Sequence, residues 1–277
     1  MKDTSLKDLL EAGCHFGHKK ERWHPKAQEF IYTEKDGTHI IDLAKTKEGL
    51  KIAAAFAKSL VAEGREIVFV GTKRQAKGVV WEETKRVGAP YFVERFIGGF
   101  LTNWSEVSKN FARMRDLRAK IKNENGVLKK KEIVLFERNL RKLEIIYGGV
   151  ENLFSPPSAL FIVDSKKEAN ALREAKRTGV KIIAIVDTNS DPTQVDFPIP
   201  ANDDAVGSIK LITNYIADAY SEGKKLFEKK GKEEEKPKEE EPVTKETTTT
   251  KVKNKRDKLP KLKKTKVKKS KEINESK

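Results

Sequence analysis

Short apolar runs alternate with longer amphipathic stretches over most of this chain. The apolar runs that we expect to form strands are 67–70, 91–93, 159–163, 182–186 and 197–199. The amphipathic stretches that we expect to form helices are 46–64, the residues after 71–74 up to Val87, 166–177, and 206 to about 227. Apolar strands that alternate with helices of this length are typical of a parallel sheet covered on both faces. The sequence therefore predicts a doubly wound α/β domain.

An N-terminal extension, residues 1–45, precedes this alternation. Ser5 and Asp8 have the spacing of a capping box, which predicts a short helix through Ala12. The residues that follow predict two short strands, at 30–32 and 39–43, around a turn at 35–37.

A different pattern interrupts the alternation after residue 93. Gly98-Gly99 supply a backbone turn, and Thr102 or Asn103 offers an N-cap for a helix that begins at Trp104. Apolar residues then recur every three or four positions along two arms. They are Val107, Phe111, Met114, Leu117 and Ile121 in the first arm, and Ile133, Phe136, Leu140, Leu143 and Tyr147 in the second. So narrow a stripe predicts an antiparallel coiled-coil hairpin with its tip at 123–126, too thin to be buried in a core.

These patterns divide the chain into three parts. The α/β domain is expected at 1–103 and 149–230, the helical hairpin at 104–148 and a charged tail at 231–277. The tail consists of an EEEKPKEEE block, a TKETTTT segment and a Lys-rich end. It has too few apolar residues to offset the entropy lost on ordering, so we expect it to be disordered.

The net charge of +16 is concentrated in two of these parts. Residues 251–277 hold 13 Lys and Arg against 3 Asp and Glu, and residues 104–148 hold 12 against 6. Segregated positive charge indicates a polyanionic partner, because neutralised phosphates release their condensed counterions. For the tail alone, a role in solubility fits equally well. The basic hairpin favours nucleic acid.

Two absences restrict the cellular setting. Every apolar run is far shorter than the ~20 residues that span a membrane, and the N-terminus lacks the apolar centre of a signal peptide. Cys14 is the only cysteine, so no intrachain disulfide can form. These features predict a cytosolic protein.

Two groups of residues are candidate metal ligands. Cys14, His15 and His18 have nearly the spacing of zinc ligands but lack a second pair. The acidic residues after the last two strands could hold a divalent cation; they are Asp187, Asp191, Asp203 and Asp204. We prefer to interpret them as caps: an Asx-type turn at 187–191, and Asp203 or Asp204 as the N-cap of the final helix. We therefore assign no metal and no cofactor.

The sequence offers little support for catalysis. The junction at 71–74 could bind an anion through backbone amides and the cations Lys73 and Arg74. However, the chain contains neither GxGxxG after the first strand nor GxxxxGK[ST], and an RNA phosphate would fit the junction as well as a nucleotide. No GxSxG motif and no oriented Cys–His pair is present. A nucleotide-dependent α/β enzyme with a basic RNA-binding appendage is the alternative hypothesis.

Several segments recur in the order and spacing of one known family. They are AGCHFGH at 12–18, WHPK at 23–26, HIIDL at 39–43, FVGTKR at 69–74, GGFLTNW at 98–104, LE at 143–144, GG at 148–149, ALF at 159–161, IVDTNSDP at 185–192 and IPANDDA at 199–205. From about residue 4 to 228 the chain resembles the ribosomal protein S2 family of bacterial small subunits. The Lys-rich tail lies outside the resemblance.

The resemblance implies a flavodoxin-like parallel sheet with a protruding coiled coil, in agreement with the hydrophobic pattern. It implies a structural protein of the cytoplasmic ribosome, without catalysis, cofactor, membrane or small-molecule substrate. Such a protein binds 16S rRNA between the head and body of the small subunit. Among its neighbouring ribosomal proteins, it supports docking of the multi-OB-fold, mRNA-binding protein S1.

In this family the coiled coil and the N-terminal region face the RNA. Carried over to this sequence, with the cations of the 71–74 junction included, RNA contact is expected at His18, Lys19, Arg22, Lys26, Lys73, Arg74, Arg95, Lys109, Arg113, Arg118, Lys120, Lys129, Lys130 and Arg138. We expect the tail after about residue 231 to add a salt-sensitive RNA contact.

Overall fold

The structure is a computed structural model that describes residues 4–123 and 130–234. All of these residues belong to one compact unit, Met1–Lys236. One sheet has five strands: β4 (Ile67–Val70), β5 (Tyr91–Phe92), β6 (Ala159–Ile162), β7 (Lys181–Val186) and β8 (Phe197–Pro200). The helices that pack on it are α2 (Leu43–Ala62), α3 (Arg74–Val87), α6 (Ala169–Thr178) and α7 (Val206–Glu234).

The five strands lie in the order β5-β4-β6-β7-β8, and every neighbouring pair is parallel. This confirms the parallel α/β domain that the apolar runs predict. Numbered along the chain, the order is 2-1-3-4-5, which is consistent with a flavodoxin-like fold. The order reverses between β4 and β6, where folds of this type bind ligands at the carboxyl ends of the strands.

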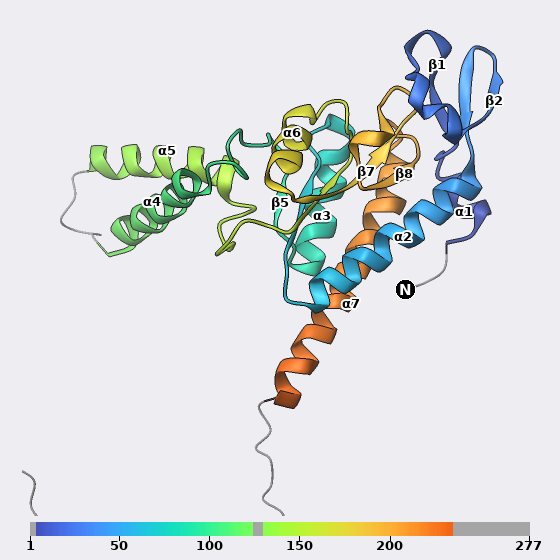
Figure 1. Ribbon diagram of the computed structural model, residues 1–277. Coiled ribbons are helices and arrows are strands. Elements are labelled where there is room, and N and C mark those ends of the chain that lie inside the picture. The colour runs from blue at the N-terminus through green and yellow to red at the C-terminus, as the bar shows by residue number, and fades with distance from the viewer. Residues whose placement is uncertain (1–3, 124–129, 235–277) are drawn as a thin grey trace, which may run out of the picture. The chain divides into compact units, whose positions relative to one another are not determined.

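Both faces of the parallel sheet are buried. On one face, Phe69 and Phe161 belong to a core that includes residues of α2, α3 and α7. Figure 1 shows α2 and α7 packed side by side. On the other face, Val68 and Leu160 pack with α6 and with Phe100 of the loop before the hairpin. Burial on two faces explains why these strands are apolar at every position instead of alternating.

The N-terminal extension forms a separate antiparallel sheet. Its strands are β1 (Phe16–Lys19), β2 (Ile31–Lys35) and β3 (Thr38–Ile41), in the order β1-β3-β2. It also contains α1 (Leu6–Glu11) and two short 3-10 helices, η1 (Lys20–Arg22) and η2 (Pro25–Phe30). The capping box of Ser5 and Asp8 is confirmed. The sequence does not predict β1, because its four residues show no apolar alternation and only pairing with β3 defines the strand.

The boundary between β3 and α2 differs from the prediction. The strand expected at 39–43 ends at Ile41, and the helix expected from Thr46 begins at Leu43. Asp42 is the cause, because its carboxylate caps the helix by accepting a hydrogen bond from the Ala44 amide at 2.9 Å. The Thr46 hydroxyl instead lies inside the first turns of the helix, bonded to the Asp42 carbonyl at 3.2 Å.

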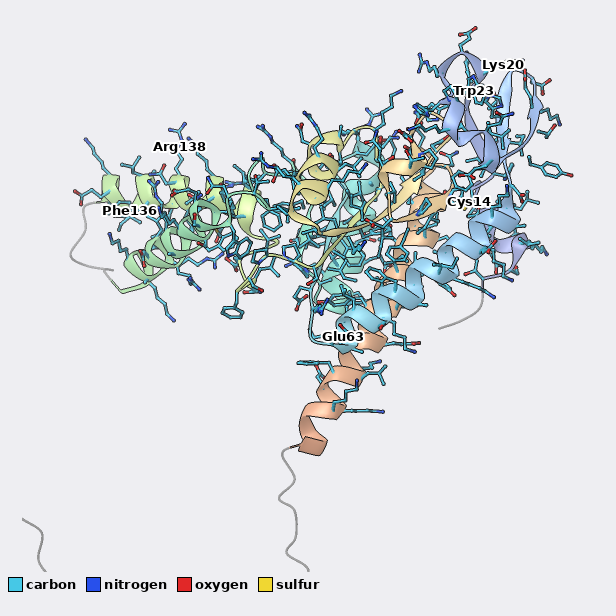
Figure 2. The ribbon with its side chains drawn as sticks, viewed as in Figure 1. Cys14, Lys20, Trp23, Glu63, Phe136 and Arg138 are labelled. Carbon is cyan, nitrogen blue, oxygen red and sulfur yellow. The ribbon has the colours of Figure 1, made fainter. Side chains whose placement is uncertain are left out.

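The hairpin consists of two helices, α4 (Trp104–Asn123) and α5 (Lys130–Tyr147), which contact each other. Val107, Phe111, Met114 and Leu117 of the first arm are buried, as the predicted seam requires. In Figure 2, Phe136 of the second arm lies between the two helices. Apart from Asn123, the predicted tip lies outside the described residues.

The base of the hairpin is more deeply buried than the sequence predicts. The seam alone is too narrow to be buried in a core, yet Val107 and Phe111 belong to the same buried cluster as Phe100 and Val150. Aromatic rings continue this cluster along α4, with 5.5 Å between the centroids of Phe100 and Trp104. The first turns of the hairpin are therefore anchored by the core of the α/β domain, because residues on either side of the insertion complete the packing.

Helix α7 is longer than its apolar pattern predicts. We expected it to end near Phe227 and the tail to begin at residue 231, but the helix continues to Glu234. The added residues are mostly Lys and Glu, which have a high helix propensity. The rest of the predicted tail lies outside the described residues. Within 4–123 and 130–234, no helix is both long and apolar enough to cross a membrane.

Candidate nucleic-acid interface

One carboxylate holds the loop that leads into the hairpin. Glu174 of α6 accepts hydrogen bonds from the backbone amides of Gly99 at 2.7 Å and Leu101 at 3.1 Å. Gly99 has a φ of 85°, a conformation that favours glycine. The Asn103 carbonyl then accepts from the Val107 amide at 3.3 Å, so Asn103 occupies one of the two predicted N-cap positions. Sequence reasoning missed Glu174 because it is 75 residues from Gly99.

Replacing Glu174 with Ala should lower the free energy of unfolding by about 1–2 kcal/mol, because two backbone amides lose their acceptor. The matched Glu174→Gln variant keeps one amide oxygen and should fall between Ala and wild type. Urea unfolding measures both changes, and hydrogen exchange at Gly99 and Leu101 should accelerate in the Ala variant. An Ala variant as stable as wild type would show that this carboxylate does not hold the loop.

The basic side chains of the hairpin mostly face solvent. Several are exposed and have no carboxylate of the described residues within 4.0 Å: Arg113, Arg115, Lys120, Lys122, Lys130, Lys131, Arg138, Arg141 and Lys142. Figure 2 shows Arg138 on the side of α5 that points away from α4. Four of the predicted RNA contacts, Arg113, Lys120, Lys130 and Arg138, are in this set. Their charges are therefore available to an external anion.

Two predicted contacts on the hairpin are engaged within the protein. Arg118 lies 2.8 Å from carboxylate oxygens of both Glu144 and Glu151, so it ties α4 to α5 and to the residues after the hairpin. Lys109 pairs with Glu106 one helical turn away, at 2.5 Å. A third predicted contact, Lys129, lies outside the described residues. Arg118 therefore stabilises the hairpin in this structure.

Outside the hairpin, the predicted contacts are divided in the same way. Lys19, Arg22, Arg74 and Arg95 are exposed, without a carboxylate of the described residues within 4.0 Å. Lys26 instead pairs with Asp191 at 2.9 Å, a bond that attaches the N-terminal extension to the loop after β7.

Asp191 is the N-cap of the 3-10 helix η3 (Pro192–Gln194). Partial burial acts to raise the pKa of its carboxyl. Hydrogen bonds from the side chains of Thr193, Lys26 and Gln194 outweigh burial and hold the pKa well below its ordinary value. The sequence prediction that this acidic loop serves as a cap is confirmed at this residue.

The depressed pKa of Asp191 predicts a pH-dependent contribution to stability. The contribution is complete above the unfolded-state pKa of about 3.9 and is lost as the pH falls from there toward the folded-state pKa. Asp191→Asn should cost about 1–2 kcal/mol at pH 7, and the difference from wild type should shrink at pH 3. Urea unfolding at both pH values measures this, and a pH-independent difference would contradict it.

Lys73 points into a group of carboxylates. Its ammonium lies 2.8 Å from Asp203 Oδ1, 2.7 Å from Asp204 Oδ1 and 3.3 Å from Asp164 Oδ2. Burial acts to lower the pKa of Lys73, but the hydrogen bonds and charges of these carboxylates outweigh it and raise the pKa above its ordinary value. A phosphate would be repelled here. At this junction, the exposed Arg74 is the better placed cation.

The crevice where the strand order reverses is occupied by the protein's own side chains. The Thr72 hydroxyl donates to the buried carboxylate of Glu168, and Lys167 donates to the Thr72 carbonyl at 3.1 Å. A Cβ added to Gly71 would lie 2.5 Å from Cγ2 of Val80, so this glycine permits close packing of α3. Among the described residues, the crevice therefore offers no phosphate-binding loop, which weighs against the nucleotide-dependent enzyme.

His18 connects the two groups of candidate metal ligands that are distant in sequence. Its Nδ1 lies 3.0 Å from Asp187 Oδ1, and its Nε2 lies 3.5 Å from Asp204 Oδ2. The hydrogen bond to Asp187 raises the pKa of His18. Cys14 and His15 are not part of this cluster: the described residues bring together ligand atoms of His18, Asp203 and Asp204 only.

The predicted N-cap of the last helix is wrong. Neither Asp203 nor Asp204 caps α7; the Asn202 side chain accepts from the amides of Asp204 at 2.8 Å and Ala205 at 3.0 Å. The two aspartates point instead toward Lys73. Because α7 begins at Val206, Asp203 and Asp204 both lie before its N-cap position.

The fold and this surface define an α/β protein with a basic helical hairpin and a filled crevice at the switch point of its sheet. The family model of ribosomal protein S2 matches residues 9–223. The chain belongs to the ribosomal protein S2 family. Proteins of this family are structural constituents of the small ribosomal subunit and are not enzymes.

Several curated relatives are similar over most of their length. The chain is 49% identical over 224 residues to small ribosomal subunit protein uS2 of Coprothermobacter proteolyticus, which covers 80% of this chain and 83% of the relative. It is 46% identical to the uS2 protein of Corynebacterium urealyticum with the same coverage. It is 44% identical to that of Koribacter versatilis, covering 83% of this chain and 76% of the relative.

Proposed function

We propose that this protein is a structural constituent of the cytoplasmic small ribosomal subunit and binds 16S rRNA through its hairpin and its N-terminal extension. The observation that carries the proposal is the set of exposed Lys and Arg side chains on α4 and α5 that have no carboxylate partner among the described residues. Such charges neutralise phosphates and release counterions, and they suit recognition of folded RNA by shape.

We propose a smaller set of direct RNA contacts than the sequence alone predicts. Exposed cations support contacts by Lys19, Arg22, Arg74 and Arg95 outside the hairpin, and by Arg113, Lys120, Lys130 and Arg138 on it. The side chains of His18, Lys26, Lys73, Lys109 and Arg118 already have acidic partners. For these five residues, a role in holding the RNA-binding surface in place fits the geometry better than direct contact.

The test is reconstitution with small subunits that lack this protein. Tagged full-length protein should co-sediment with the subunits at about 50 mM salt and be released in large part at about 200 mM, because phosphate contacts give a steep salt dependence. Binding that is unchanged by salt would contradict an interface of phosphate contacts. Migration as free protein under both conditions would reject ribosomal binding.

A finer part of the proposal concerns a neighbouring protein. We infer from the family resemblance that the bound protein supports docking of the multi-OB-fold ribosomal protein S1. Subunits reconstituted with this protein should therefore retain S1 on a sucrose gradient, whereas subunits without it should lose S1. Equal retention by both would reject this part and leave RNA binding intact.

A further inference from the structure

A cavity of about 310 Å³ lies between the N-terminal extension, the turn before α6 and the loop after β7. This volume is at the lower end of the range of about 300–1,000 Å³ that is typical of ligand pockets. Each of the three segments contributes to its lining, among others by Arg22 and Trp23, Ser165 and Lys166, and Asn189 and Gln194. Neither His18 nor Lys73 lines it, so the cavity is separate from the group of carboxylates around them.

Bonds between the segments hold the cavity open. The His24 amide donates to the Thr188 carbonyl at 2.8 Å, and Lys26 pairs with Asp191 at 2.9 Å. Both bonds fasten the N-terminal extension to the loop after β7. The walls are therefore in place before any ligand arrives, which lowers the entropy that binding must cost.

One polar group in the lining has no partner within the protein. Ser165 follows β6 and is only 3% exposed, and its Oγ is buried without a hydrogen bond. A buried hydroxyl without a partner is costly, and a hydrogen bond to a polar ligand atom would remove that cost. The cavity therefore suits a ligand with hydrogen-bonding groups.

The charges around the cavity favour an anion. Arg22 and Lys166 are exposed at its lining, and neither has a carboxylate of the described residues within 4.0 Å. Asp191 is the sole acidic side chain among the described residues that line the cavity, and Lys26 neutralises it. Free Arg and Lys side chains bind phosphate through charge-assisted hydrogen bonds.

An aromatic ring lies beside these cations. Trp23 is partly buried, and its ring packs against His39 with 5.5 Å between the centroids, which holds the indole in place while it lines the cavity. Figure 2 shows Trp23 in the N-terminal extension. The exposed carboxamide of Gln194 adds a further hydrogen-bonding group to the lining. Aromatic stacking, polar groups for a base edge and cations for phosphate together match an RNA nucleotide.

We propose that this cavity holds one unpaired nucleotide of the ribosomal RNA, with its base against Trp23 and its flanking phosphates on Arg22 and Lys166. The Ser165 hydroxyl bonds to the edge of the base. A base within a helix has its faces stacked and its edge paired, so the site selects a nucleotide from a bulge, a loop or a strand end. The inference rests on the proposed RNA binding and adds Trp23, Ser165 and Lys166 to the residues that carry it.

The test uses small subunits that lack this protein, reconstituted with the full-length chain. Ultraviolet cross-linking followed by mass spectrometry should join the peptide that contains Trp23 to a nucleotide of 16S rRNA. Trp23→Ala should weaken subunit binding about 5- to 150-fold, whereas Trp23→Phe should retain most of the affinity because it keeps a ring for stacking. Trp81→Ala is the matched control, since Trp81 is half-exposed on α3 outside the cavity, and it should bind as wild type does.

Two further variants separate ligand contact from a structural role. Lys166→Ala removes an exposed side chain, so it should fold normally and lower the slope of log affinity against log salt by about 1. Ser165→Ala should weaken subunit binding about 2- to 10-fold, yet the free protein should melt at or above the wild-type temperature because a buried hydroxyl without a partner is removed. A serine with a purely structural role would lower the melting temperature and leave binding unchanged.

The outcomes distinguish this site from the proposed function. If the wild-type protein co-sediments with the subunits but Trp23→Ala and Ser165→Ala bind equally well, the nucleotide site is rejected and RNA binding stands. A cross-link from Trp23 to a ribosomal protein instead of RNA would also overturn the site. Failure of the wild-type protein to co-sediment would reject the proposed function and the nucleotide site with it.

Discussion

Replacing Arg113, Lys120 and Arg138 together with Ala should weaken binding to the small ribosomal subunit on the order of 100-fold at low salt. Each side chain is exposed and has no acidic partner among the described residues, so the substitution removes charge without disturbing packing. The slope of log affinity against log salt should also fall by about 3, one unit for each lost phosphate contact. Sedimentation at several salt concentrations measures both quantities.

A control with the same loss of charge separates position from net charge. Lys210, Lys224 and Lys225 are exposed on α7, and their replacement by Ala also removes three positive charges. This variant should bind nearly as wild type does. If the two triple variants lose affinity equally, the hairpin is not the RNA-binding surface and general charge attraction drives binding. Arg118 is left unchanged in both, because its loss would disturb the ion pairs that hold the hairpin.

Gly149→Ala should lower the free energy of unfolding by about 3 kcal/mol and the melting temperature by about 6–12 °C. A Cβ at this position would lie 2.2 Å from the Tyr91 carbonyl oxygen and 2.9 Å from its ring. The Gly149 carbonyl also accepts the Tyr91 amide at 3.0 Å, which fixes edge strand β5 beside the end of the hairpin. Because the closest contact is with the backbone oxygen of Tyr91, rotation of the Tyr91 side chain cannot relieve the clash.

Gly78→Ala is the matched control for this prediction. Gly78 lies within α3, is exposed, and has nothing within 4 Å of an added Cβ. Ala should therefore raise stability by about 0.5–1 kcal/mol through helix propensity and a restricted unfolded chain. Thermal unfolding followed by circular dichroism should show shifts of opposite sign. A Gly149 variant that melts at or above the wild-type temperature would contradict the packing described for β5.

The sequence predicts a helix or strand correctly where one local hydrophobic pattern dominates. Burial on two faces makes β4, β6 and β7 apolar at every position, so their runs are visible without knowledge of the fold. The seam of the hairpin repeats every three or four residues, and α4 begins at Trp104 as predicted. Strand β1 has no such pattern, and the sequence after Phe227 has no apolar pattern that marks the end of α7, so the strand was missed and the helix end was misplaced.

For the candidate RNA-binding surface, the sequence predicts where the positive charge lies but not which cations are free to bind. Composition locates the positive charge in the hairpin, but it does not distinguish the exposed Arg113 from Arg118, whose charge is neutralised by Glu144 and Glu151. The same holds for Lys73, which sequence alone places beside Arg74 as a phosphate ligand and the fold turns toward Asp203. Charge is a property of a residue, whereas its availability depends on neighbours that are distant in the chain.

By itself, the sequence determined the class of fold, the inserted basic hairpin and the resemblance to the ribosomal protein S2 family, because these follow from periodicity and from contiguous motifs. Tertiary structure decided which cations remain free, that Glu174 holds the hairpin loop, and that His18 meets Asp203 and Asp204. Those contacts join residues separated by many tens of positions. Their partners are selected by the order of strands in the sheet and by the packing of the extension on its carboxyl edge, neither of which leaves a local pattern in the chain.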